Sequence, residues 1–187
     1  GVTALLALMR LHLARADARS PADGSLVLLR DQDRSRWDRA AVGGGVVLLG
    51  RAQRMGRPGP YQLQAAIIAT HALAPTWEAT PWGAIVAGYD ALVRIQPTPV
   101  VLMNRALALA ERDGPSVGLE ALKPLGDRLD GYHLFHAARA ELLRRSGDDE
   151  GARAANLRAL ELTSNPAERR LIQGGLRSQP ARGGSSG

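Results

Sequence analysis

Apolar residues recur at helical spacing along almost the whole chain. Between Val2 and about Arg19 they stand at positions 2, 5, 6, 9, 13 and 16, which is the period of an amphipathic helix. Residues 25–29 (SLVLL) fit either a short extended piece or a helical turn. Proline, glycine and capping residues divide the remainder, and the pattern predicts about nine helices and no convincing strand. The later helices are expected over residues 60–74, 81–95, 99–112, 115–125, 132–146, 149–162 and 166–176.

The helix before these has an unusual composition. We expect it to follow a cap at Asp33 or Ser35 and to carry apolar residues from Trp37 to Met55 on one side. Three consecutive glycines, residues 43–45, lie in its middle. Each costs a helix about 1 kcal/mol relative to alanine. We therefore expect a helix that is locally weak there or closely packed against a neighbour.

A 34-residue period organises the second half of the chain. The segments 104–107 (NRAL) and 138–141 (ARAE) lie 34 residues apart in similar helical surroundings, and 34 residues is the length of a tetratricopeptide repeat. After Gly147 the spacing of small residues resembles the second half of such a unit. We expect four residues there to be buried: Leu143, Ala152, Ala159 and Leu160.

This period predicts an all-α fold of stacked antiparallel helical hairpins, a tetratricopeptide-like right-handed superhelix. Three hairpins are expected, over residues 60–95, 99–125 and 132–162, with a capping helix after them. We expect residues 1–177 to form one domain, in which residues 1–57 are an N-terminal helical part and residues 60–177 hold the hairpins. Residues 178–187 (SQPARGGSSG) lack apolar content and are expected to be disordered.

Composition restricts the chemistry that this chain can perform. It contains no cysteine, which excludes disulfides and thiolate metal sites. The apolar N-terminal stretch is interrupted by Arg10 and Arg15 and is too short to span a bilayer, which needs about 20 apolar residues. The net charge is +6, from 24 basic and 18 acidic residues. Because acids interleave with the basic clusters, the charge is typical of solvated helix faces rather than of a nucleic-acid surface.

Catalytic and metal-binding signatures are absent from the sequence. There is no G-x-S-x-G, H-E-x-x-H, Walker or G-x-G-x-x-G motif. His133 and His136, three residues apart, could share a metal, but no third ligand is evident, so core packing or capping is the better interpretation. His12 and His71 lie in apolar helices and are expected to be satisfied packing residues. We expect no enzyme activity, no metal and no cofactor.

Two stretches look too specific for ordinary surface. Residues 31–38 (DQDRSRWD) place five charges around one Trp, and residues 59–67 (GPYQLQAAI) place two Gln on the first turns of a helix. Capping and helix packing would explain both, and a contact surface is the alternative. In the first stretch we expect Trp37 to bury its ring while Asp33 or Asp38 pairs with an Arg. The candidate interaction residues are Asp31, Gln32, Asp33, Arg34, Trp37, Asp38, Tyr61, Gln62, Gln64, His71, Asn104, Arg105, Tyr132, His133 and Arg139.

Several longer motifs carry a family resemblance. They are, in order, RDQDRSRWD, GPYQLQAAIIATHA, PTPVVLMNRALALA, LDGYHLFHAARAELLRRSGD and SNPAERRLI. Together they resemble the C-terminal extension of a group of bacterial extracytoplasmic-function sigma factors, in which a tetratricopeptide-like domain follows the promoter-binding domains. The resemblance covers residues 2–177 and implies a cytoplasmic regulatory domain that controls transcription initiation. Its implied partners are the sigma factor's own DNA-binding domains and the RNA polymerase core.

Two function hypotheses follow. In the first, the domain acts through these protein contacts and makes no specific contact with promoter DNA. In the second, the chain is a stand-alone tetratricopeptide adaptor that binds a peptide or protein partner in its concave groove. Neither hypothesis involves a membrane.

Overall fold

The computed structural model describes residues 1–19, 28–56 and 58–177, and the described residues contain helices and no strand. The predicted tail and most of the SLVLL stretch lie outside them. The α-helices are α1 (Val2–Leu13), α2 (Ala16–Arg19), α3 (Arg39–Arg54), α4 (Pro60–Leu73), α5 (Trp82–Ile95), α6 (Pro99–Asp113), α7 (Pro115–Leu122), α8 (Gly126–Leu129), α9 (His133–Arg145), α10 (Asp149–Leu162) and α11 (Pro166–Arg177). Three short 3₁₀ helices are η1 (Leu29–Asp31), η2 (Arg34–Arg36) and η3 (Lys123–Leu125). The all-α prediction is confirmed.

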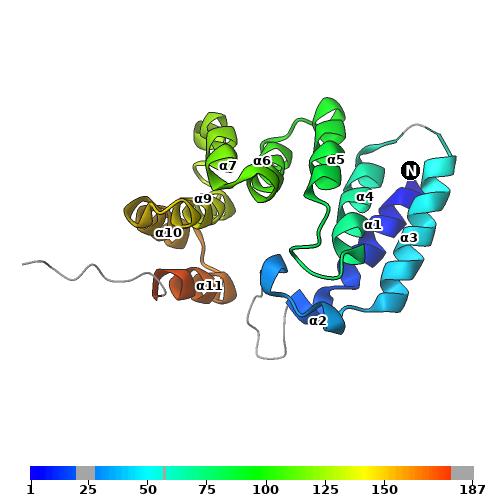
Figure 1. The fold of residues 1–187 in the computed structure, drawn as a ribbon, viewed down its shortest axis with the longest axis horizontal. Coiled ribbons are helices and arrows are strands. Elements are labelled where there is room, and N and C mark those ends of the chain that lie inside the picture. Colours follow the sequence, from blue (N-terminus) through cyan, green and yellow to red (C-terminus); the bar gives the residue numbers. More distant parts are fainter. Residues whose placement is uncertain (20–27, 57, 178–187) are drawn as a thin grey trace, which may run out of the picture.

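The helices pack one after another along an arc (Figure 1). α1 packs against both α3 and α4, and from α4 onward each long helix packs mainly on its neighbours in the chain. Three clusters of buried side chains follow the arc, one under α1, α3 and α4, one under α4–α6, and one under α6–α9. Such serial packing is the arrangement expected of stacked hairpins, because each pair buries its apolar stripe only against the next.

The N-terminal part differs from the prediction in its helix boundaries. α1 ends at Leu13 rather than near Arg19, because the carbonyl of Ala14 accepts a hydrogen bond from the backbone N–H of Asp38 at 2.9 Å. α3 begins only at Arg39, and Asp38 caps it by accepting from the backbone N–H of Ala41 at 2.9 Å. Trp37 therefore precedes the helix, and the predicted helix face was wrong. The buried face consists of Val42, Gly45, Leu49 and Ala52.

The glycine run is explained at Gly45 by close packing of α3 on α1. A Cβ added at Gly45 would lie 2.7 Å from Cγ of Leu11, a fully buried side chain of α1. A Cβ added at Gly43 would meet nothing within 4 Å. The helix thus runs unbroken through all three glycines, and only part of the run is required by its neighbour.

In the last hairpin, the prediction of buried residues is partly confirmed. Ala152 and Ala159 of α10 are fully buried. Leu143 and Leu160 are only half-buried, so for these two the prediction was wrong. On α9 the core position belongs to Leu142, which joins the cluster formed with α6 and α7.

No helix within the described ranges combines the length and the apolar content that crossing a bilayer requires.

Candidate functional site

The site lies on the inside of the arc, where residues 28–38, here called the inner segment, lie between α4 and α11 (Figure 1). The inner segment includes η1 and η2 and contains the predicted charged stretch 31–38. It ends where Asp38 caps α3. Side chains of the inner segment form hydrogen bonds with α4, α6 and α9, which follow later in the sequence.

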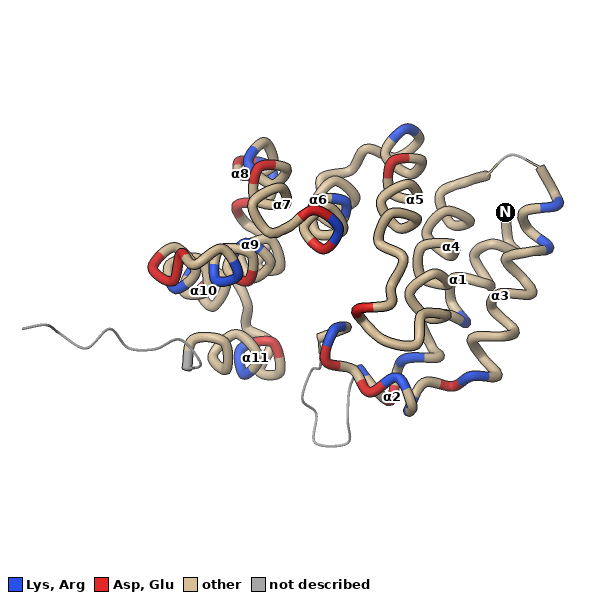
Figure 2. The backbone as a smooth tube through the Cα atoms, in the orientation of Figure 1, with Lys and Arg blue, Asp and Glu red and all other residues tan. Residues whose placement is uncertain are grey.

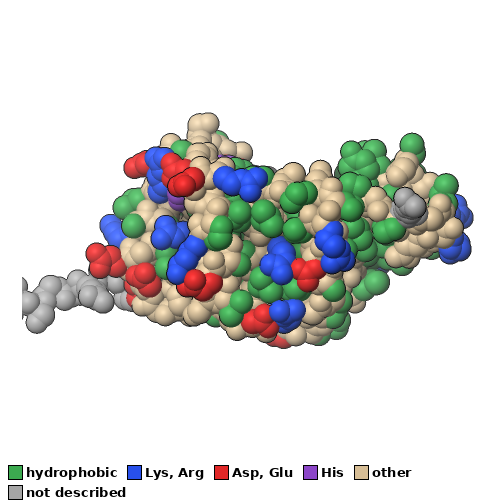
Figure 3. All heavy atoms as spheres, turned by 90° about the horizontal axis from the view of Figure 1, so that it is seen from above, with side chains coloured by type: hydrophobic (Ala, Val, Ile, Leu, Met, Phe, Trp, Pro, Cys, Tyr) green, Lys and Arg blue, Asp and Glu red, His purple; other side chains and the backbone are tan. Residues whose placement is uncertain are grey.

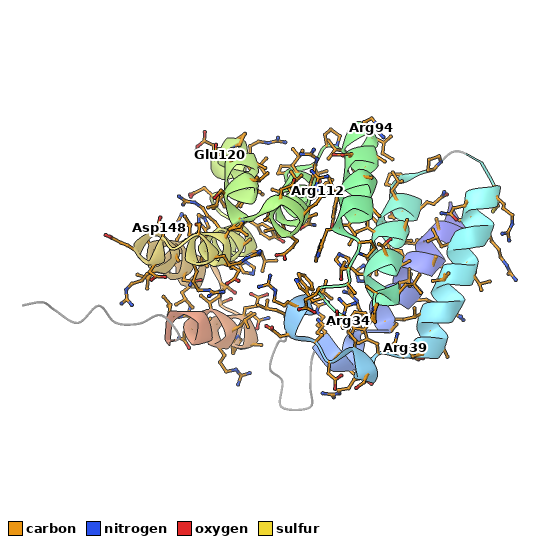
Figure 4. The ribbon with its side chains drawn as sticks, viewed as in Figure 1. Arg34, Arg39, Arg94, Arg112, Glu120 and Asp148 are labelled. Atoms are coloured by element: carbon orange, nitrogen blue, oxygen red, sulfur yellow. The ribbon has the colours of Figure 1, made fainter. Side chains whose placement is uncertain are left out.

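Arg34 is the centre of the inner segment (Figure 4). Its Nη1 donates to the backbone carbonyls of His71 at 2.8 Å and Ala74 at 2.6 Å, and its Nη2 lies 3.4 Å from the hydroxyl of Thr80. The last carbonyls of a helix have no partner within the helix and attract cations. The Arg34 side chain thus caps the C-terminal end of α4, and burial lowers the pKa of its guanidinium.

Trp37 anchors the end of the inner segment. Its ring is only 2% exposed, and the guanidinium carbons of Arg34 and Arg15 lie 5.0 Å and 5.9 Å from its centroid. Burial of this ring was predicted and is confirmed. Stacking of a guanidinium on an indole is favourable by about 0.5–2 kcal/mol. Among the described residues neither arginine forms an ion pair, although the charge of Glu78 acts on Arg34 at longer range.

The predicted ion pair of Asp33 or Asp38 with an Arg is wrong for the described residues. Asp33 accepts from the backbone N–H and hydroxyl of Ser35, at 2.9 Å and 2.6 Å, and these bonds lower the pKa of its carboxyl. Asp38 accepts from Ala41 at the start of α3. Short side chains in an Asp-x-Ser or N-cap position bond the nearest free N–H groups, and this local geometry outcompetes a longer-range pair.

Arg30 and Glu111 join the other end of the inner segment to the repeats. Nη2 of Arg30 lies 3.1 Å from both carboxylate oxygens of Glu111 on α6, and its Nη1 lies 3.4 Å from Glu141 on α9. Glu111 also pairs with Arg145 of α9 and accepts from the indole N–H of Trp77 at 3.2 Å. The Arg30 guanidinium lies 5.3 Å from the Trp77 ring centroid.

Sequence reasoning missed this second network entirely. Glu111 is 15% exposed at its side chain, so the network is partly shielded from water. Figure 2 shows that the inner segment, α6 and α9 all carry charged positions. One signal was available in the sequence, because 77, 111 and 145 are each separated by the 34-residue repeat period. Equivalent positions in successive repeats lie one above another along a stack, so polar residues there are candidates for direct contact.

Three aromatic rings close the site beside Arg34. The His71 ring lies 6.3 Å from Trp77 and 5.1 Å from Trp82, and the two indoles are 4.7 Å apart. Burial, helped by the positive charges of Arg15 and Arg34, lowers the pKa of His71 to about 4. His71 was expected to be satisfied, but its Nδ1 is buried without a hydrogen-bond partner. It is therefore a neutral imidazole with an unused nitrogen at pH 7.

The remaining predicted residues fall into separate places. Gln64, His71 and Asn104 line one cavity together with Gln96, whose Oε1 lies 3.5 Å from Nε2 of Gln64. Arg105 pairs with Asp90 of the preceding helix at 2.6 Å. Five other predicted residues lie away from the inner segment, on α4 and around α9: Tyr61, Gln62, Tyr132, His133 and Arg139.

The two histidines of α9 face different partners. Nε2 of His136 lies 2.7 Å from the carbonyl oxygen of Asp130, so the predicted packing and capping role is confirmed for this residue. Nε2 of His133 lies 3.0 Å from Oε2 of Glu168 on α11, close enough for an ion pair when protonated, but the two groups are not aligned as a hydrogen bond. Among the described residues no three His, Asp or Glu side chains form a group suited to a metal ion.

This chain is similar to a family of unknown function and to an uncharacterized bacterial protein. Residues 1–53, which include α1 and the inner segment, match a family of unknown function, DUF6596. An uncharacterized protein of Rhizobium meliloti (strain 1021) is 46% identical over 173 residues, which cover 92% of this chain. The chain spans only 40% of the length of that relative. No solved structure is significantly similar to this chain.

Proposed function

We propose that this chain is a regulatory domain of an RNA polymerase sigma factor, which controls transcription initiation in the cytoplasm through protein–protein contacts. The motifs that resemble the sigma-factor extension run through the inner segment, α4, α6, α9 and α11. The similar Rhizobium meliloti protein matches 92% of this chain and is more than twice as long as this chain, which leaves room for further domains in that protein. The proposed partners are the sigma factor's own DNA-binding domains and the polymerase core.

The observation that carries this proposal is an exposed apolar stripe on α1. Val2, Leu6, Met9 and Leu13 recur at the spacing of one helix face and are 83%, 45%, 53% and 67% exposed. The opposite face of α1 packs on α3 and α4. Figure 3 shows hydrophobic side chains grouped at the end of the molecule that holds these helices. Exposed apolar side chains gathered on one helix face are typical of a protein contact site.

Specific DNA recognition is not part of the proposal. Three arginines of this network already have acidic partners, since Arg30 and Arg145 pair with Glu111 and Arg144 pairs with Glu141. Reading bases requires a helix that presents free donors to the major groove. The proposed mode of action is therefore contact with protein and not catalysis or promoter binding.

The adaptor hypothesis has less support on the inner side of the arc. A peptide bound in the concave groove would meet the inner segment, which already contacts α4, α6 and α9. A partner on the α1 stripe fits both hypotheses. The identity of that partner separates them.

The test uses the longer native protein and a promoter reporter. Replacing Leu6 and Met9 together by Glu removes the apolar stripe at exposed positions, so the fold should survive while reporter transcription and co-purification with RNA polymerase both change. Leu157→Glu on α10, at a residue of similar exposure (45%), is the matched control and should leave both unchanged. Deletion of residues 1–177 should alter transcription at least as much as the double replacement.

Three results would contradict the proposal. They are unaltered transcription after the deletion, equal effects of the stripe and control variants, and tight promoter-specific DNA binding by this chain alone at about 150 mM salt, where non-specific binding is weak.

A further inference from the structure

A second feature, separate from the α1 stripe, is a cavity between α1, α4, α5 and α6. Its volume is about 460 Å³, within the range of sites for small molecules. Aliphatic side chains of α4–α6 line part of it, among them Ile67 and Leu92. Its polar lining includes Arg15, Gln64, His71, Tyr89, Gln96 and Asn104. No acidic side chain is among the residues that line it.

Arg15 brings a positive charge to the lining of the cavity. Among the described residues no carboxylate forms an ion pair with it, and its Nε is buried without a hydrogen-bond partner. Burial lowers the pKa of its guanidinium, and the nearby charges of Arg19 and Arg34 act in the same direction. A partly buried charge without a partner is unfavourable, and an anion placed beside it would remove that cost.

His71 supplies an independent second observation. It is only 8% exposed, it lines the cavity, and its Nδ1 has no partner. Buried polar atoms without a partner are uncommon in native proteins and call for an explanation. In the tautomer that carries hydrogen on Nδ1, His71 holds a neutral donor without a partner in the wall of the cavity. The hydroxyl of Tyr89 is neutral as well, because burial raises its pKa to about 12.

We propose that this cavity binds a small organic acid, whose anionic group is held by Arg15 and by Nδ1 of His71 and whose apolar part lies against Ile67 and Leu92. The amides of Gln64 and Asn104 supply further donors for oxygen atoms of the ligand. Carboxylates and phosphate monoesters share this chemistry. The proposal does not depend on the proposed role in transcription.

Such a ligand would join the two parts of the molecule. Arg15 follows α1 in the N-terminal part, whereas Tyr89 and Asn104 belong to the repeat helices α5 and α6. A ligand that binds only the folded state raises stability with its concentration. We therefore expect bound acid to raise the melting temperature of the chain.

The test measures binding of three probes that share one phenyl ring: benzoate, phenyl phosphate and the neutral benzamide. Titration calorimetry and amide chemical shifts should show saturable binding of at least one anion, with benzamide weaker by at least about tenfold, or 1.4 kcal/mol. Benzoate alone would identify a carboxylate site, and phenyl phosphate alone a phosphate site. Shifts should concentrate on α4, α5 and the end of α1.

Variants locate the binding in this cavity. Arg15→Gln should weaken binding of the anion by at least about tenfold, while Arg153→Gln, at an exposed arginine of α10 that does not line the cavity, should leave binding unchanged. Should Arg15→Gln fail to fold, Asn104→Leu keeps the side-chain volume and removes one of the amide donors proposed for the ligand, so it should also weaken binding. The proposal is overturned when neither anion binds, when benzamide binds as tightly, or when the cavity variants that fold bind like wild type.

Discussion

Trp77 and Glu111 are separated by 34 positions and are joined directly, the indole N–H donating to Oε2 of Glu111 at 3.2 Å. Arg145, another 34 positions on, pairs with the same carboxylate from the other side. One acid thus connects three successive repeat positions and also accepts Arg30 from the inner segment. Removing it would leave the partly buried Arg145 without this carboxylate and would leave Arg30 with only the longer contact to Glu141.

Glu111→Ala should therefore lower the free energy of unfolding by about 2–4 kcal/mol, because breaking a shielded ion pair leaves an uncompensated charge. Glu120→Ala is the control, since Glu120 pairs with Lys123 in full contact with water and should change stability by about 0.5 kcal/mol or less. Urea denaturation measures both. Equal effects of the two substitutions would show that the Glu111 network contributes nothing beyond an ordinary surface pair.

Arg34→Met should destabilise the chain by about 2–4 kcal/mol. It keeps much of the side-chain volume but leaves the carbonyls of His71 and Ala74 without their charged donor. Arg39→Met, at an exposed position five residues later, should stay within about 0.5 kcal/mol of wild type. Thermal and urea unfolding compare the two variants. An Arg34 variant as stable as wild type would show that the inner segment does not stabilise α4.

Stability should fall in mild acid because of His71. Its pKa is about 4 in the folded chain and about 6.5 when unfolded, so the unfolded chain binds the proton more readily between these values. The stabilising contribution of the neutral His71 to the free energy of unfolding is complete above pH 6.5. It decreases as the pH falls through this window, by about 2 kcal/mol between pH 7 and pH 5. His71→Gln should flatten that part of the pH profile, measured as the urea midpoint. An unchanged pH profile would mean that this imidazole is not held neutral by burial.

The glycine run offers a matched pair of substitutions. Gly43→Ala should raise stability by about 0.5–1 kcal/mol, because alanine favours the helix and its Cβ meets nothing within 4 Å. Gly45→Ala should lower it by about 1–3 kcal/mol through overpacking against Leu11. Differential scanning calorimetry of both variants checks the sign of each effect. Stabilisation by both would contradict the close approach of α1 and α3.

The repeat helices were predictable because the signals that form them are local. Pro60, Pro99 and Pro166 stand at the first positions of α4, α6 and α11, where proline fits a helix start. The N-terminal region was less predictable. Whether α3 begins after Ser35 or after Asp38 depended on the hydrogen bond between Asp38 and Ala14, 24 positions apart, which no periodicity encodes.

By itself, the sequence determined the helices, their 34-residue period and the burial of Trp37, since each of these follows from short-range spacing and side-chain polarity. Only the tertiary structure decided where the inner segment lies. Its defining contacts join Arg34 to His71 across 37 positions and Arg30 to Glu111 across 81. The cavity beside Arg15 arises in the same way, from four helices whose approach is set by packing. The sequence determines the charge and the hydrogen-bonding groups of each residue. Which donor meets which acceptor depends on how the helices pack together.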